Sequence, residues 1–179
     1  MGKLYSEITP AFEALIRKQK IYFTGTAAPE GRVNVSPKGI DTFRILAPDR
    51  VMWLNLTGSG NETAAHLLES PRISIMFCMF EGKPHIIRLY GQGRVIHPTD
   101  TEWKKYIGLF PDIPGARQLI DVKVDSVQGS CGYAVPLMEY KGERNEFINW
   151  AEKLGPEKME EYKRKNNSLS LDGKPTGLQ

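Results

Sequence analysis

The sequence has few of the features that mark several common classes of protein. Its 179 residues include only two cysteines, Cys78 and Cys131, which lie far apart and form no Cys-x-x-Cys spacing. This excludes a disulfide framework and a cysteine-based zinc site, and favours a cytoplasmic protein with reduced thiols. No apolar run approaches the roughly 20 residues needed to cross a bilayer. The first ten residues lack the apolar core of a secretory signal, so we expect no membrane partner.

An excess of charge of one sign is also missing. The net charge is only +3, and the lysines and arginines alternate with acidic residues. Without a basic run interleaved with aromatic residues, we expect no nucleic-acid partner. The three histidines do not have the spacing of a metal site, so we expect no metal. A hydrophobic fraction of 40% is ordinary for a globular protein of this length, which predicts one domain.

β-strand patterns dominate the first two thirds of the chain. Six or seven segments combine β-branched or aromatic residues with turn residues at their ends, namely residues 21–26, 32–36, 43–46, 51–56, 72–80, 85–96 and 117–127. Most are joined by short turns, with one helix between the fourth and the fifth. A parallel sheet would need helices between most strands. The pattern therefore predicts a mainly β (α+β) fold, a closed or nearly closed antiparallel barrel.

The last third of the chain has a different character. Residues 143–154 form an amphipathic helical pattern, and residues 157–165 are highly charged, which predicts a solvated helix. The final 14 residues contain little to bury and are expected to form a tail. We assign residues 1–140 to the barrel and residues 141–179 to helices and a tail of the same domain.

Residues 53–68, WLNLTGSGNETAAHLL, are the most informative stretch of the chain. An apolar strand enters a Gly-Ser-Gly turn, and the turn opens onto a helix. Ser59 and Glu62 fit the capping-box pattern, in which both side chains bond to amides at a helix start. Glycines allow close approach to a ligand, and a helix N-terminus attracts phosphate. The alternative is a turn that only connects two elements.

Two further segments and one arginine could line a ligand site. In RVNVSPKG, residues 32–39, alternation places Arg32, Asn34 and Ser36 on one face with Lys38 beyond; the alternative is a solvated strand face. Residues 130–136, SCGYAVP, pass close to a ligand or partner, or form a simple loop after a strand. Arg88 lies among apolar residues, so it either forms a structural ion pair or faces a polar ligand.

The order of five segments resembles one known family. RVNVSPKG, WLNLTGSGNETAAHL, RISIMFCMFEG, IIRLYGQG and SCGYAVP together resemble the pyridoxamine 5′-phosphate oxidase-related family of FMN-binding split barrels, in an uncharacterised branch. The resemblance covers about residues 21–136. It implies a six-stranded antiparallel FMN-binding split barrel with peripheral helices. It also implies a homodimer with two FMN sites at the subunit interface.

The resemblance carries a set of expected FMN contacts. A basic residue of the second strand and groups of the strand-to-helix turn would hold the phosphate, while residues 130–133 would line the interface near the site. The expected cofactor-binding residues are Arg32, Asn34, Ser36, Lys38, Asn55, Thr57, Gly58, Ser59, Gly60, Asn61, Thr63, Arg88, Ser130, Cys131, Gly132 and Tyr133.

The chain also departs from the true oxidases. Where they carry an Arg-Lys pair at the helix start, this sequence has Glu62 and Thr63. The resemblance therefore implies an FMN-dependent oxidoreductase that does not oxidise pyridoxamine phosphate, with an unassigned small-molecule substrate or electron donor. A flavin-binding carrier, a redox sensor without turnover and a deazaflavin-dependent reductase remain alternatives, as does a barrel without a cofactor. No side chain is assigned as a catalytic acid or base.

Overall fold

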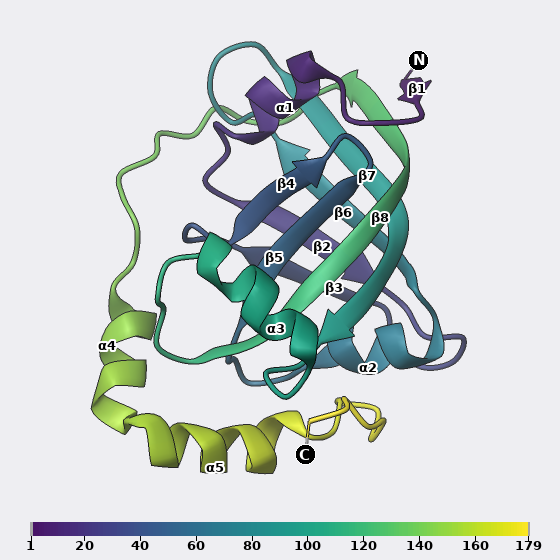
Figure 1. Ribbon diagram of the computed structural model, residues 1–179. Coiled ribbons are helices and arrows are strands. Elements are labelled where there is room, and N and C mark those ends of the chain that lie inside the picture. The colour runs from purple at the N-terminus through teal and green to yellow at the C-terminus, as the bar shows by residue number, and fades with distance from the viewer. Residues whose placement is uncertain (1, 179) are drawn as a thin grey trace.

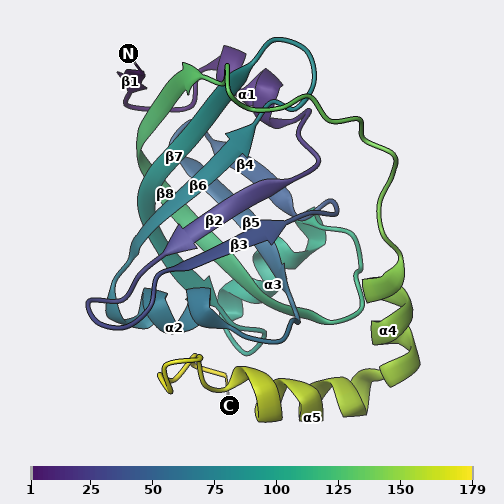
Figure 2. The same ribbon diagram turned by 180° about the vertical axis from the view of Figure 1, so that it is seen from behind.

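The protein folds into an eight-stranded antiparallel sheet that curls into a barrel. The computed structural model describes residues 2–178. The sheet order is β3-β2-β6-β7-β8-β5-β4, with β1 paired to β8. Figures 1 and 2 show the curled sheet from opposite sides. The strands are β1 (Lys3–Tyr5), β2 (Tyr22–Thr26), β3 (Asn34–Lys38), β4 (Phe43–Ala47), β5 (Arg50–Leu56), β6 (Arg72–Cys78), β7 (His85–Ile96) and β8 (Ala116–Cys131).

Short helices cover the two ends and one side of the barrel. They are α1 (Pro10–Ile16), α2 (Glu62–Glu69), α3 (Thr101–Tyr106), the 3₁₀ turn η1 (Ile107–Leu109), α4 (Glu146–Leu154) and α5 (Pro156–Asn167). In both views α1 lies at one end, and α2 and α5 lie at the other. The start of α1 is capped by Thr9, whose Oγ1 accepts a hydrogen bond from the amide of Phe12 at 3.3 Å.

Strand β5 shows why the sheet is covered on both faces. Because successive side chains of a strand point to opposite faces, Trp53 faces the barrel interior and packs with Ile75, Phe77 and Ile120. Its neighbours Met52 and Leu54 belong to a second core, which packs beneath α3 and η1. Residues 51–54 of the strand are therefore apolar on both faces, as expected for a strand buried on both sides.

The long strand β7 contains Gly91 and Gly93, and two glycines inside a strand pattern predict a bend or a bulge. The pairing of β7 with β8 shifts register between Tyr90 and Gly91. A Cβ at Gly91 would overlap the main-chain carbonyl of Lys123. Only glycine allows this close approach of two backbones, so the predicted bulge is confirmed.

The structure confirms the mainly β antiparallel barrel and differs from the prediction in three places. The sheet has eight strands, whereas the resemblance implied six. The three-residue strand β1 was not predicted, because so short a segment carries no period. Residues 168–178, which we call the strap, were expected to form a tail with little to bury. Instead, Leu169 bridges Pro175, and Thr176 is fully buried. The strap folds back beside α2.

No helix described within residues 2–178 is long and apolar enough to cross a bilayer.

Candidate functional site

The turn between β5 and α2 is shaped by contacts that are distant in sequence. Thr57 donates to the carbonyl oxygen of Gly115 through both its amide, at 2.9 Å, and its Oγ1, at 2.8 Å. Thr57 was an expected cofactor contact, but its hydroxyl bonds to Gly115, just before β8, and Thr57 does not line the cavity beside the turn. These two bonds fix the backbone where the glycine turn begins.

The predicted capping box at this turn is wrong. Helix α2 begins at Glu62, its N-cap position is Asn61, and Ser59 is exposed at the cavity. The Glu62 carboxylate accepts from the amide of Leu171 at 3.0 and 3.1 Å. This partner lies in the strap, so a local pattern could not identify it. The first amides of α2 still lack intrahelical partners, as at any helix start.

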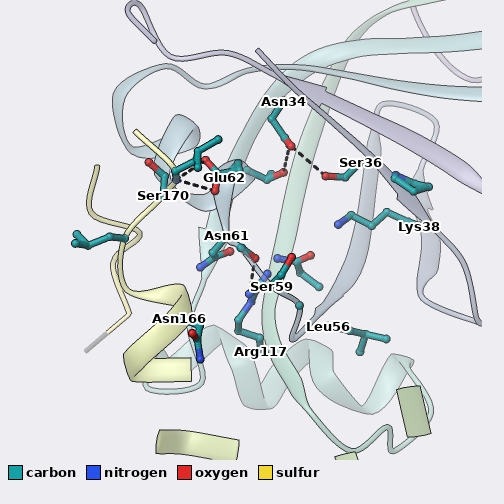
Figure 3. Close-up of a pocket in the computed structure, with 17 residues that line it drawn as sticks. Asn34, Ser36, Lys38, Leu56, Ser59, Asn61, Glu62, Arg117, Asn166 and Ser170 are labelled. Carbon is teal, nitrogen blue, oxygen red and sulfur yellow. Dashed lines mark hydrogen bonds between the residues drawn. The ribbon is translucent and has the colours of Figure 1, made fainter. Parts of the chain in front are cut away.

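A cavity of about 560 Å³ opens beside the turn. This volume lies in the range of small-molecule sites. Figure 3 shows side chains from β3, the turn, β8 and the C-terminal residues around it. The lining residues are Asn34, Ser36, Pro37, Lys38, Asn55, Leu56, Gly58, Ser59, Gly60, Asn61, Glu62, Thr63, Arg117, Asn166, Leu169, Ser170 and Leu171.

The polar face of β3 forms one wall of the cavity. Asn34, Ser36 and Lys38 alternate along the strand and all line the cavity. Ser36 Oγ donates to Asn34 Oδ1 at 3.2 Å, and Asn34 Nδ2 donates to Thr63 Oγ1 at 3.3 Å. This chain of bonds ties β3 to the first turn of α2. The edge position of β3 also tolerates Pro37, which cannot donate to a sheet.

Two cations meet at the cavity without a carboxylate partner among residues 2–178. Lys38 forms no ion pair there, and neither does Arg117, which is only 3% exposed. Burial, reinforced by the charge of Arg117, lowers the pKa of Lys38 to about 8. Burial also lowers the pKa of Arg117 to about 10. Burying unpaired cations is costly, so this arrangement favours binding of an anion.

Several buried polar atoms at the cavity lack a hydrogen-bond partner among the described residues. They include Arg117 Nε, Asn55 Oδ1 and Asn61 Oδ1. Unsatisfied buried groups are rare and mark strain or a ligand site. A ligand with an anionic group and further polar atoms fits this set of donors and acceptors.

The expected site residues divide into two groups in space. Nine of them line this cavity, namely Asn34, Ser36, Lys38, Asn55, Gly58, Ser59, Gly60, Asn61 and Thr63. Arg32 lies outside the cavity and forms an exposed ion pair with Asp172 of the strap. Arg88, Ser130, Cys131, Gly132 and Tyr133 lie on or after the paired part of β7 and β8 at the α1 end of the barrel.

Within the second group, Arg88 has a polar partner. Arg88 Nη1 donates to Ser130 Oγ at 3.2 Å across the β7–β8 pair. The structure thus places Arg88 and residues 130–133 beside each other, and away from the cavity of the same chain.

Sequence reasoning missed Arg117 and the C-terminal wall. Arg117 was read only as the start of a strand, although a charged residue beside the apolar run of β8 needs a partner or a ligand. That mismatch was the available signal. Asn166 and the three strap residues 169–171 gave no local signal for a place in the cavity wall. Leu171, for example, bonds to Glu62, which lies 109 residues earlier in the chain.

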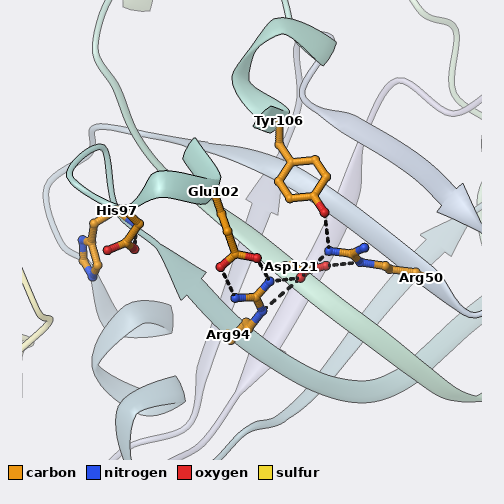
Figure 4. Close-up of polar contacts among 7 residues, drawn as sticks. Arg50, Arg94, His97, Glu102, Tyr106 and Asp121 are labelled. Carbon is orange, nitrogen blue, oxygen red and sulfur yellow. Dashed lines mark hydrogen bonds and ion pairs between the residues drawn. The ribbon is translucent and has the colours of Figure 1, made fainter. Parts of the chain in front are cut away.

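A second polar cluster lies on the outer face of the barrel. Asp121 accepts from Arg50 Nε at 2.8 Å and from Arg94 Nε at 3.0 Å. Arg94 also contacts Glu102, and Arg50 contacts the Tyr106 hydroxyl. Figure 4 shows that these side chains are hydrogen-bonded or ion-paired with one another. The cluster therefore fastens α3 to β5, β7 and β8, and leaves no unpaired charge comparable to Lys38.

The barrel and its cavity define a split-barrel protein with a cation-lined site, and the comparisons give the family. A family profile described as "Pyridoxamine 5'-phosphate oxidase" matches residues 8–131. The chain is 38% identical to the pyridoxamine 5′-phosphate oxidase family protein ustO of Aspergillus flavus. That match covers 98% of this chain and 78% of the relative. The chain belongs to the pyridoxamine 5′-phosphate oxidase family, as the sequence resemblance predicted.

Solved structures share the fold at low identity. A crystal structure titled as a putative pyridoxamine 5′-phosphate oxidase from Lactobacillus delbrueckii has a TM-score of 0.53 at 17% identity. It covers 69% of this chain and 94% of that chain. HutZ of Vibrio cholerae, titled a heme storage protein, has a TM-score of 0.51 at 14% identity, covering 71% and 98%. At these identities the likeness concerns the fold alone.

Proposed function

We propose that the protein is an FMN-dependent oxidoreductase whose cofactor phosphate binds between Lys38 and Arg117. The observation that carries the proposal is a pair of cations, the buried Arg117 and the partly buried Lys38, that have no carboxylate partner among residues 2–178. A terminal phosphate supplies the missing negative charge. The start of α2 and the hydroxyl of Ser59 add donors for its oxygens.

The neutral polar residues around the cations suit the rest of an FMN molecule. Asn34 and Ser36 of β3 and Asn55 of β5 offer donors and acceptors to ribityl hydroxyls and ring heteroatoms. Bound FMN would supply the electron transfer, while these residues bind and orient it and tune its electronics. We assign them to binding, and assign no residue to proton transfer.

The carboxylate of Glu62 lines the same cavity but forms no ion pair with Lys38 or Arg117 among residues 2–178. It was the reason to keep a deazaflavin open, because it replaces a basic residue of the true oxidases. In the structure it is engaged by the amide of Leu171 on the strap side of the turn. Lys38 and Arg117 therefore stay without a carboxylate partner in the described part of the chain, which supports a phosphate-bearing cofactor such as FMN.

A homodimer is the second part of the proposal. Arg88 and residues 130–133 are expected flavin contacts, yet they lie away from the cavity of their own chain. They would reach a flavin only from a second copy of the chain. The same region exposes apolar side chains, with Tyr133 85% and Leu137 80% exposed. Burial of these groups against a partner would favour association.

The visible spectrum and FMN titration of the purified protein test the proposal. We expect a yellow protein, or a colourless one that binds added FMN much more tightly than riboflavin, because only FMN carries the phosphate. Reduction by NAD(P)H with transfer to an acceptor faster than free FMN would support an enzyme. Tight binding without turnover would instead indicate a carrier or sensor. A protein that binds neither FMN nor a deazaflavin would contradict the proposal.

A further inference from the structure

The cavity includes a wall that lies beyond the part of the chain shared with the family profile. The profile match ends at residue 131, whereas α5 ends at Asn167 and the strap follows. Asn167 is fully buried beside the turn and Arg117. A buried amide at the end of a highly charged helix needs a reason, because the rest of α5 faces mainly solvent.

The Asn167 side chain connects the cation of the site to the glycine turn. Its Oδ1 accepts from Arg117 Nη1 at 2.5 Å, and its Nδ2 donates to the carbonyl oxygen of Gly58 at 2.9 Å. Its main-chain oxygen accepts from Asn61 Nδ2 at 3.3 Å. One residue thus contacts Arg117 and both ends of the turn.

These contacts determine which edge of the Arg117 guanidinium faces a ligand. Nη1 is shared between Asn167 Oδ1 and the carbonyl oxygen of Gly60, the latter at 3.0 Å. Because the guanidinium is planar and its donors form a rigid fork, fixing Nη1 also fixes the direction of the remaining donors. Among these, Nε is buried and has no partner among residues 2–178.

The strap in turn holds Asn167 in place. Thr176 Oγ1 donates to the main-chain oxygen of Asn167 at 2.6 Å. Two contacts fasten the strap to α2: the Leu171 amide donates to the Glu62 carboxylate, and Lys174 Nζ donates to Glu69 Oε2 at 2.6 Å. Asn167 is therefore held through its main-chain oxygen as well as through its side chain.

We infer that Asn167 is a positioning residue of the phosphate site. It holds one edge of Arg117 and the carbonyl of Gly58, so that the free guanidinium edge and the turn present donors to one phosphate group. The identification of that phosphate as part of FMN rests on the proposed function. The positioning itself requires only a phosphate.

Affinities for FMN and riboflavin test this inference, because their ratio isolates the contribution of the phosphate. We expect Asn167→Ala to weaken FMN binding about tenfold while leaving riboflavin binding unchanged. In an Arg117→Met background the same substitution should have no further effect, since its target is gone. Asn149→Ala, on the exposed side of α4, is the matched control and should change neither affinity.

Asn167→Asp provides a second variant if the alanine variant does not fold. The carboxylate keeps an acceptor for Arg117 but partly neutralises it, so FMN affinity should fall while riboflavin affinity persists. The inference would be overturned if the Asn167 variants lost FMN and riboflavin affinity equally. It would also be overturned if Asn167→Ala weakened FMN binding as much in the Arg117→Met background as in the unaltered protein.

Inorganic phosphate separates failure of this inference from failure of the proposed function. Phosphate should raise the Tm of the unaltered protein, and raise it less for Asn167→Ala. If FMN does not bind but this difference is found, the positioning role stands and the flavin assignment fails. If phosphate stabilises both proteins equally, the positioning role is wrong. If it stabilises neither, there is no phosphate site and both proposals fail.

Discussion

Lys38 is the residue on which the charge of the site depends most directly. It lies on an edge strand, it is partly buried, and no carboxylate among residues 2–178 pairs with it. A phosphate contact with a lysine is a charge-assisted bond, stronger than a bond between neutral groups.

Replacing Lys38 tests this contact. We expect Lys38→Ala to weaken FMN binding at least tenfold, because such a contact contributes roughly 1.5–3 kcal/mol. Fluorescence titration with FMN measures the effect. Lys83→Ala, an exposed lysine in the turn between β6 and β7, is the control and should bind FMN normally. Unchanged affinity in Lys38→Ala would remove this residue from the site.

The pH dependence of binding gives a second measurement on the same residue. In the free protein the pKa of Lys38 is lowered to about 8, so the group is mostly charged at pH 7 and mostly neutral at pH 9.5. A phosphate dianion favours the charged form and raises this pKa, so binding above pH 8 takes up a proton. FMN affinity should therefore fall as the pH rises from 8 to 9.5.

Two comparisons assign this pH dependence to Lys38. Riboflavin, which has no phosphate, should bind with little change over the same range. Lys38→Arg should flatten the FMN curve, because a guanidinium loses its proton at a higher pH than the amine of Lys38. A fall of equal slope in Lys38→Arg would mean that another group titrates.

Asp121 is the residue whose charge we expect to matter most for stability. Its side chain is 6% exposed and forms ion pairs with Arg50 and Arg94, which are both partly exposed to solvent. We expect Asp121→Asn to lower the free energy of unfolding by about 2 kcal/mol, because both charge-assisted pairs lose their carboxylate. Urea unfolding measures it. Asp125→Asn, exposed on the same strand, should be nearly neutral, and an equal loss there would contradict a specific role for Asp121.

Among the elements, β7 depends most on a single small residue. Its bulge at Gly91 brings the strand against the main chain of Lys123. We expect Gly91→Ala to destabilise the protein by more than about 2 kcal/mol, because a Cβ there requires two paired strands to move apart. Gly108→Ala is the control, since a Cβ at that position meets no atom within 4 Å. Thermal unfolding of both variants should separate them clearly.

Elements with a strong local pattern were predictable, and contacts across the chain were not. The seven longer strands, α2 and the bulge followed from side-chain alternation and from glycine. The polar face of β3 likewise identified Asn34, Ser36 and Lys38. Glu62 shows the limit: its spacing from Ser59 satisfied a capping pattern, but its partner is a strap amide 109 residues away. Arg117 and Asn167 likewise belong to the site through hydrogen bonds between residues that are far apart in the sequence.

For the molecule as a whole, the prediction to test is that two copies of the chain form a homodimer. The proposed dimer would bring residues 130–133 of one subunit to the flavin of the other. We expect the protein to sediment as a dimer, and Tyr133→Asp to weaken both dimerisation and FMN binding, because a charge would be buried at the interface. Tyr133→Phe should preserve both. A monomer that binds FMN at full affinity would contradict this arrangement.

The anchoring of the strap also has a consequence for motion. Among the described residues, the strap is held to α2 and to Arg32, just before β3, by side-chain bonds and ion pairs and not by a strand ladder. It can therefore open by local fluctuation while the barrel remains folded, and its amides should exchange hydrogen faster than those of the β6–β7 pair. The amide of Leu171 donates to Glu62 of α2, so this bond exists only when the strap is closed. A phosphate ligand that needs Arg117 held by Asn167 should slow exchange at this amide. Exchange in the β6–β7 pair, which already opens only with the barrel, should change far less.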